Sequence, residues 1–305
     1  MSVNREIRMT TRQIGFLAMI FSVSGYALLP ILTRAIYQVS DLQPTDLAIW
    51  RFVFATPAIW LAIAMREKVS KTKRLKRDEP RQILIMLSLG LLYAGAALSV
   101  FFGLQYIQAS LYVVLFYTYP TIVALISVML GQRLPWLSWL AIALTLGGVI
   151  LTVPDLRFAG ENTALGLMIA LMNAVFVAVY FVIVSRQMPK MSSVSRGAAY
   201  VITGTLLILI LFIPVFGLNM PSTPLAWSLL LVMALWSTAM PIFVINIGIQ
   251  KLGVTQASII STSEPILTMV LALVLLNEII LPIQWVGAIL IISGVLLLEL
   301  RFKRK

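Results

Sequence analysis

The chain has 305 residues, of which 60% are hydrophobic and only 11% are charged, and its mean hydropathy is +0.99. A soluble domain carries about 25% charged residues, so this composition excludes a soluble globular protein and predicts an integral membrane protein. The chain has no cysteine and no histidine. Disulfides, thiol chemistry and the usual metal ligands are therefore excluded, and we expect no metal and no cofactor.

Ten segments are long and apolar enough to cross a bilayer, which takes roughly 20 residues. Backbone groups in lipid must be satisfied within the segment, so we expect helices rather than strands. The first segment is too long for the core of a signal peptide and lacks a clear cleavage site, so we interpret it as a retained span. In chain order the predicted spans are 14–37, 46–66, 82–104, 108–130, 135–153, 164–185, 197–217, 224–249, 255–276 and 282–300.

The distribution of positive charge predicts how these spans are oriented. With the N-terminus placed in the cytoplasm, all but three of the 23 Lys and Arg residues fall on the cytoplasmic side. The exceptions are Arg157 in an outer loop, and Arg34 and Arg51 within spans near the outer face. By the positive-inside rule, both termini are expected in the cytoplasm. The net charge of +12 is thus interpreted as a topology signal, and we expect no nucleic-acid partner.

The two halves of the chain repeat one pattern. Tyr119-Pro120 and Glu264-Pro265 lie at matching places in two spans, and 139–149 matches 285–295 in its tryptophan and its later glycine. The matching positions are 145 or 146 residues apart. Each half, 1–155 and 156–305, holds an odd number of predicted spans, so the two repeats must lie in the membrane with opposite orientation. Inverted repeats are a common plan of membrane transporters.

This ordered set of features resembles the drug/metabolite transporter superfamily, EamA branch, over essentially the whole chain. Within the branch it looks most similar to bacterial exporters of aromatic and other amino acids, the YddG type. The resemblance implies an all-α fold with a central cavity between the repeats, in the bacterial inner (plasma) membrane. It also implies export of small metabolites. In the Gly-Glu-Arg loop that follows span four in the family, this chain has Gln132, whereas its second half keeps Glu278.

Glu264 is the carboxylate that we expect near the middle of the bilayer. A charge there costs several kcal/mol, so an intramembrane carboxylate is a candidate for function. It could carry a proton, or it could satisfy a backbone carbonyl freed by Pro265. The sequence leaves both readings open. Pro120 and Pro265 are candidate kinks or gates because they recur in both halves.

Polar and aromatic residues at mid-depth are the candidates for binding a substrate. Aromatic faces and amide dipoles are what an aromatic or apolar amino acid would need, although ordinary helix packing could also use them. The predicted binding residues are Tyr26, Tyr112, Phe116, Tyr119, Asn173, Tyr180, Trp236, Asn246 and Ser261.

We therefore predict a secondary transporter that exports aromatic and other neutral amino acids by alternating access. The alternative is a proton-coupled effluxer of drugs or small metabolites, and a third reading is a membrane scaffold without transport. No phosphate-binding Gly-Lys-Ser/Thr loop and no catalytic Ser/His/Asp set is present, so we do not expect an enzyme or an ATP-driven pump. The expected partners are a small-molecule substrate and membrane lipid, and a monomeric state is compatible with the sequence.

Overall fold

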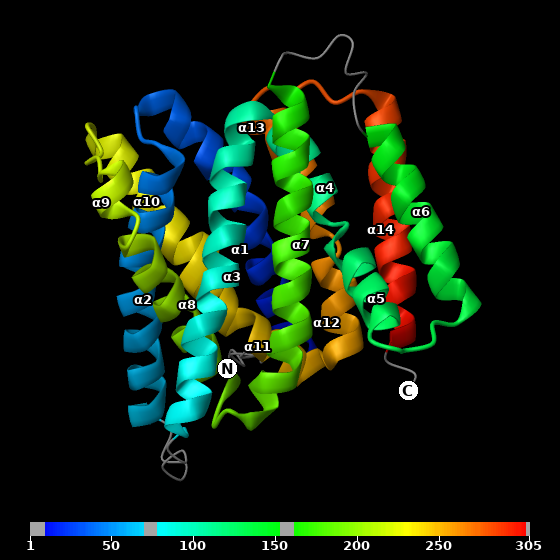
Figure 1. Cartoon of the computed structure of the whole chain (residues 1–305), viewed down its shortest axis with the longest axis horizontal. Coiled ribbons are helices and arrows are strands. Elements are labelled where there is room, and N and C mark those ends of the chain that lie inside the picture. The colour runs from blue at the N-terminus through cyan, green and yellow to red at the C-terminus, as the bar shows by residue number, and fades with distance from the viewer. Residues whose placement is uncertain (1–9, 70–77, 153–161, 303–305) are drawn as a thin grey trace, which may run out of the picture.

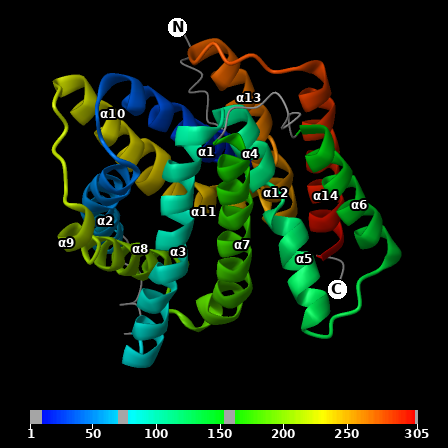
Figure 2. The same ribbon diagram turned by 45° about the horizontal axis from the view of Figure 1, so that its top comes forward.

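The computed structural model describes residues 10–69, 78–152 and 162–302, and all regular secondary structure within them is helical. Seven helical stretches are long and apolar enough to cross a membrane, judged by length and composition, and three shorter apolar ones are 136–152, 259–275 and 282–298. Each of these stretches overlaps one predicted span. The helices stand side by side, with α6 and α14 together at one edge (Figures 1 and 2).

Six helices run without interruption: α1 (Thr11–Val39), α2 (Pro44–Val69), α3 (Pro80–Tyr106), α6 (Trp136–Thr152), α7 (Thr163–Gln187) and α14 (Pro282–Phe302). The others are shorter pieces of predicted spans: α4 (Ala109–Phe116), α5 (Tyr119–Met129), α8 (Val194–Ile210), α9 (Ile213–Phe216), α10 (Pro224–Ala234), α11 (Met240–Leu252), α12 (Val254–Ser261) and α13 (Glu264–Leu275). A 3₁₀ turn covers Met188–Lys190, and a π-helical turn, η2, covers Leu235–Ala239.

The fourth and ninth predicted spans are each broken in the middle, between α4 and α5 and between α12 and α13. A proline follows each break, at the second position of the new helix, where its missing N–H costs little. A threonine hydroxyl satisfies a carbonyl at each break, since Thr118 donates to Leu115 O and Thr262 donates to Ile259 O, both at 2.7 Å. The two half-helices therefore begin at Tyr119 and at Glu264, at matching places in the chain.

The eighth predicted span contains a π-helical turn rather than a regular α-helix. The turn η2 lies between α10 and α11, just ahead of Pro241. The hydroxyl of Thr238 donates to Met233 O at 3.2 Å, five residues back, as expected where the helical ladder is widened. Such π-turns change the angular position of all residues that follow, and they occur frequently at functional sites.

α6 and α14 approach each other closely because small residues line their contact. A Cβ atom on Gly148 would lie 2.6 Å from Gly287 O, and one on Gly294 would lie 2.6 Å from Ala141 O. Thr145 is fully buried in the same contact, and its hydroxyl donates to a carbonyl of its own helix. Close packing of small residues is how helices associate in lipid, where apolar burial gives little driving force.

Helix contacts made by the first half of the chain recur in the second half with partners exchanged. α1 packs against α10, α11 and α13, and correspondingly α7 packs against α3, α4 and α5. α2 contacts α10, and α3 contacts α8. The pairs α2–α8, α4–α13 and α6–α14 each join one helix from either half.

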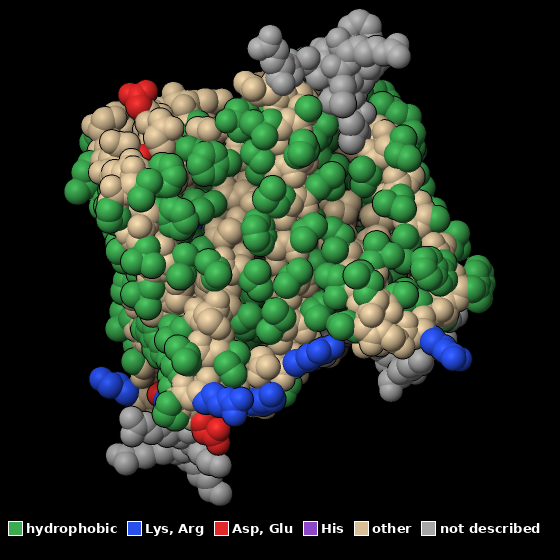
Figure 3. All heavy atoms as spheres, viewed as in Figure 1, with side chains coloured by type: hydrophobic (Ala, Val, Ile, Leu, Met, Phe, Trp, Pro, Cys, Tyr) green, Lys and Arg blue, Asp and Glu red, His purple; other side chains and the backbone are tan. Residues whose placement is uncertain are grey.

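The surface is apolar along its flanks. Large hydrophobic side chains such as Leu84, Ile150 and Met168 are more than half exposed, and Figure 3 shows similar side chains covering most of the visible face. Lys and Arg side chains gather on that face along the end where α2 finishes and α3 begins (Figures 1 and 3). This is the end that the charge distribution of the sequence assigns to the cytoplasm.

Candidate functional site

A cavity of about 300 Å³ lies at the centre of the helix assembly. Residues of α1, α2, α3 and α7 line one part of it, and residues of α4, α5, α11, α12 and α13 line the rest. Pockets that hold small ligands start at about this volume, so the space suits one small metabolite. Eight of the ten predicted polar and aromatic site residues line it: Tyr26, Tyr112, Phe116, Tyr119, Asn173, Tyr180, Ser261 and Glu264.

The other two predicted residues, Trp236 and Asn246, do not line the cavity. The side chain of Trp236 is 38% exposed and its ring lies edge-on to Phe21. The amide of Asn246 donates to Ile242 O in its own helix at 2.7 Å. The sequence indicated how deep these residues lie, but their direction depends on the π-turn, which rotates α11 relative to α10. Ile245 is the residue of α11 that lines the cavity.

The walls of the cavity are largely aromatic. Tyr119 of α5 stacks on Phe181 of α7, with ring centroids 5.4 Å apart and an angle of 15° between the rings. Phe116 tilts against Tyr119 at 5.2 Å, and Tyr93 of α3 lies 5.4 Å from Tyr180 of α7. Rings held in this way present flat faces to an apolar or aromatic ligand. Tyr93 and Phe181 were not among the predicted residues.

Asn173 gives the cavity a polar group with spare capacity. It is 1% exposed, and its Nδ2 donates to the hydroxyl of Tyr112 at 2.8 Å. Its Oδ1 has no hydrogen-bond partner among the described residues. A buried acceptor without a partner is costly and uncommon in proteins, so Asn173 is a residue of the cavity lining whose hydrogen bonding is incomplete.

Glu264 connects the two broken spans. The hydroxyl of Tyr117, at the break between α4 and α5, donates to Glu264 Oε2 at 2.9 Å and also lies 3.2 Å from Ser261 O. A phenol carries a single proton. When the glutamic acid is protonated it can donate to the phenol oxygen, and the phenol then donates to Ser261 O. The hydrogen bonds between Tyr117 and Glu264 can therefore form whether Glu264 is protonated or ionised.

Arg51 is a charged residue of the cavity that was not among the predicted site residues. It lies in α2, is 4% exposed and lines the cavity. Its Nε donates to the Thr238 hydroxyl at 2.7 Å, and its guanidinium lies 5.1 Å from the ring centroid of Phe52 and 5.8 Å from that of Phe101. Its position in the chain indicates a place inside the span: Arg51 is the eighth residue of α2 and so lies about 10 Å along the helix. The charge count alone accounts for Arg51 as a basic residue near the outer face, which is a topology signal and not a site prediction.

Glu278 lies outside the cavity and caps a helix. Its carboxylate accepts from the backbone N–H of Ala109 at 2.7 Å and of Ser110 at 3.0 Å, and from the Ser110 hydroxyl at 2.6 Å. These are the first two residues of α4, where N–H groups lack partners within the helix. Gln132, at the matching place of the first half, is exposed.

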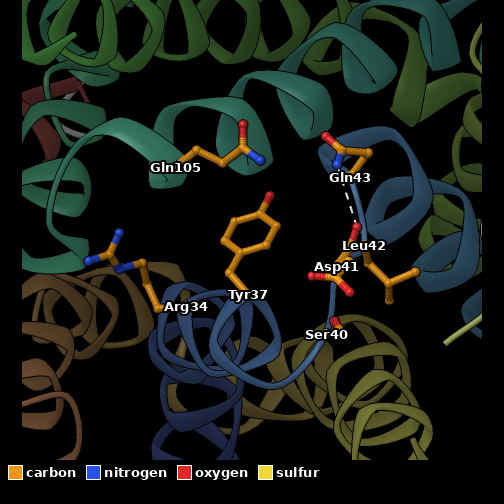
Figure 4. Close-up of a pocket in the computed structure, with 7 residues that line it drawn as sticks. All are labelled: Arg34, Tyr37, Ser40, Asp41, Leu42, Gln43 and Gln105. Carbon is orange, nitrogen blue, oxygen red and sulfur yellow. Dashed lines mark hydrogen bonds between the residues drawn. The ribbon is translucent and has the colours of Figure 1, made fainter. Parts of the chain in front are cut away.

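A second, more open pocket of about 350 Å³ lies beside the connection between α1 and α2. Figure 4 shows Tyr37 projecting from α1 toward Gln105 of α3, with Arg34 beside it. Arg34 donates to Leu104 O at 3.0 Å, and the Tyr37 hydroxyl donates to Phe101 O at 2.8 Å. Phe101 is fully buried, and its ring contacts Arg51. Phe101 thus contacts one residue of the open pocket, Tyr37, and one residue of the central cavity, Arg51.

Comparison with known proteins identifies a matching protein family, a related protein and a solved structure with a similar fold. The model of the EamA-like transporter family matches residues 13–153 and again residues 164–300. An uncharacterized transporter of Synechocystis sp. (strain PCC 6803) is 31% identical over 205 residues, which are 65% of this chain and 61% of that protein. A crystal structure is similar over 98% of this chain and 100% of its own, with a TM-score of 0.61 and 19% identity, which speaks for the fold alone.

Proposed function

This chain belongs to the EamA-like transporter family and is a multi-pass membrane transporter, and we propose that it exports aromatic and other neutral amino acids from the cytoplasm by alternating access. The proposal includes ten membrane-crossing helices in two inverted repeats, 1–155 and 156–305, in a bacterial inner membrane. Both termini then lie in the cytoplasm. The YddG-type exporters, which the sequence resembles, are the family members that motivate this substrate class.

Two observations support the inverted arrangement. The helix contacts recur with partners exchanged between the halves, as a twofold relation between repeats requires. The helix breaks ahead of Pro120 and Pro265 fall at matching places in the two halves. Broken helices beside a cavity at the repeat interface are the recurring design of secondary transporters.

The lining of the cavity carries the substrate proposal. Stacked rings such as Tyr119 and Phe181 suit an aromatic or large apolar side chain. The free Oδ1 of Asn173 and the carboxylate of Glu264 suit the ammonium group of an amino acid. A cavity of about 300 Å³ accommodates one amino acid.

The decisive test is counterflow in liposomes that contain the purified chain and are loaded with each of the twenty amino acids. We expect aromatic and large neutral amino acids to exchange fastest, and the exchange to continue without a pH gradient. Failure of every amino acid to exchange would contradict the proposal.

Glu264 favours one alternative, a proton-coupled effluxer of drugs or small metabolites. Among the described residues it is the only carboxylate that lines the cavity, and a lone intramembrane carboxylate is what proton coupling uses. In this case efflux of cationic dyes would depend on a pH gradient and would be lost when Glu264 is replaced by Gln, while amino acids would not compete.

A further inference from the structure

We propose that Arg51 binds the carboxylate of the substrate, so that the substrate class is small organic carboxylates with an apolar or aromatic side chain. This inference rests on the transport function proposed above, and it names the chemical group that a substrate of the central cavity must carry. It also excludes amines that lack a carboxylate from efficient transport.

The guanidinium of Arg51 has unused hydrogen-bond capacity. A guanidinium carries five N–H donors in a fixed fork that matches a carboxylate. In the ranges that the structure describes, only Nε makes a hydrogen bond, to Thr238. The two terminal nitrogens, which carry four of the five donors, belong to a side chain that lines the cavity and is 4% exposed.

The charge of Arg51 also lacks a counter-ion. No carboxylate of the described part of the chain forms an ion pair with it. A buried charge without a partner is strongly unfavourable. The faces of Phe52 and Phe101 offset only part of this cost, because a cation–π contact contributes about 0.5–2 kcal/mol. A carboxylate entering the cavity would supply the missing partner.

The two charged groups of the cavity complement a zwitterion. Arg51 and Glu264 both line the cavity, yet these two do not pair with each other. An amino acid can therefore place its carboxylate at Arg51 and its ammonium group near Glu264 and Asn173. Its side chain then lies among the aromatic rings.

The π-turn orients Arg51 for this role. Thr238 is part of η2, and its hydroxyl holds Nε of Arg51 while itself donating to Met233 O. The fork is thus fixed at one corner, and its remaining donors are left for a ligand. Preorganised donors lose less entropy on binding than flexible ones.

A purely structural tie between α2 and η2 is the competing explanation, and ligand chemistry separates the two. Three probes share a phenyl ring: phenylalanine, 3-phenylpropionate without the ammonium group, and phenethylamine without the carboxylate. We would measure their inhibition of phenylalanine counterflow in liposomes, and the shift in melting temperature that each causes in the detergent-purified protein. The variants are Arg51→Gln, Arg51→Lys and the control Arg34→Gln, whose residue lines the open pocket instead.

We expect the wild-type protein and Arg34→Gln to respond to phenylalanine and 3-phenylpropionate about ten-fold or more better than to phenethylamine, as a charge-assisted hydrogen-bond pair implies. Arg51→Gln should lose that preference while leaving the response to phenethylamine unchanged. Arg51→Lys should retain part of it, because lysine keeps the charge but not the fork.

The outcomes separate this inference from the function on which it rests. If amino acids exchange but Arg51→Gln keeps its preference for carboxylates, or loses all three responses equally, the inference is overturned and export stands. If no amino acid exchanges but 3-phenylpropionate still stabilises the wild type and not Arg51→Gln, export fails and the carboxylate site stands. A wild type that neither carboxylate stabilises overturns the inference.

Discussion

At the scale of single residues, the polar groups of the cavity each connect separate helices. Tyr117 joins the break between α4 and α5 to Glu264 at the start of α13, Asn173 joins α7 to Tyr112 of α4, and Arg51 joins α2 to η2. These hydrogen bonds fix where the lining helices meet. Substitutions at the cavity should therefore affect both transport and stability, and the replacement must be chosen to separate the two.

Glu264 provides the first prediction. Glutamine at this position still accepts the hydrogen bond from Tyr117, whereas alanine removes that acceptor. We expect Glu264→Gln to keep most facilitated transport, and Glu264→Ala to lose transport or about 1–3 kcal/mol of stability. Counterflow with and without a pH gradient measures this. Loss of transport in Glu264→Gln, together with loss of the response to the gradient, would instead make Glu264 the proton carrier.

Glu278 provides the second prediction, with Gln132 as its matched control. Alanine at Glu278 removes the acceptor for two backbone N–H groups at the start of α4 and for the Ser110 hydroxyl. We expect Glu278→Ala to lower the melting temperature and to cost about 1–2 kcal/mol, as loss of a helix cap does. Gln132→Ala, at an exposed position, should change little. Equal melting temperatures for the two variants would contradict the capping role.

At the scale of helices, the contact between α6 and α14 depends on residues that are small. Gly148 faces the backbone of α14, where an added Cβ has no room, whereas nothing lies within 4 Å of a Cβ on its neighbour Gly147. This pair of adjacent glycines separates the effect of helix propensity from the effect of packing.

We expect Gly148→Ala to destabilise the protein by about 1–3 kcal/mol, as overpacking does. Gly147→Ala should be neutral or slightly stabilising, because alanine favours a helix by about 0.5–1 kcal/mol over glycine. Thermal unfolding in detergent gives the comparison. A Gly148→Ala variant as stable as Gly147→Ala would show that α6 and α14 can separate without cost.

Helix positions were predictable from the sequence because apolar length alone marks a segment that can cross a bilayer. Pro120 and Pro265 predicted kinks in the fourth and ninth spans, and the structure has a helix break just ahead of each of these prolines. The direction in which each helix turns its side chains was not predictable. The π-turn, which takes Trp236 and Asn246 away from the cavity, has no reliable sequence signal. Arg51 was not predicted as a site residue because an arginine near a membrane surface is also what the positive-inside rule accounts for, and the sequence does not distinguish the two roles.

At the scale of the whole molecule, the proposed topology can be tested directly because the chain has no native cysteine. Ser222 lies ahead of α10 and Gln132 lies after α5, and both are exposed. We expect Ser222→Cys to react with a membrane-impermeant maleimide added outside intact cells. Gln132→Cys should react only after the membrane is opened. Labelling of both from the same side would contradict an arrangement in which ten helices cross the membrane.

The breaks in the fourth and ninth predicted spans also shape the electric field of the cavity. Each break creates a new helix N-terminus inside the assembly, and a helix N-terminus carries about half a positive charge. At α13 the first residue is Glu264, which offsets that charge when ionised, but the first turn of α5 has no acidic residue. Repeats of matching geometry thus carry different charge. The carbonyl end of α4 adjoins the start of α5 and offsets the positive end of its dipole, so the two breaks differ in charge by one carboxylate, that of Glu264, whenever it is ionised.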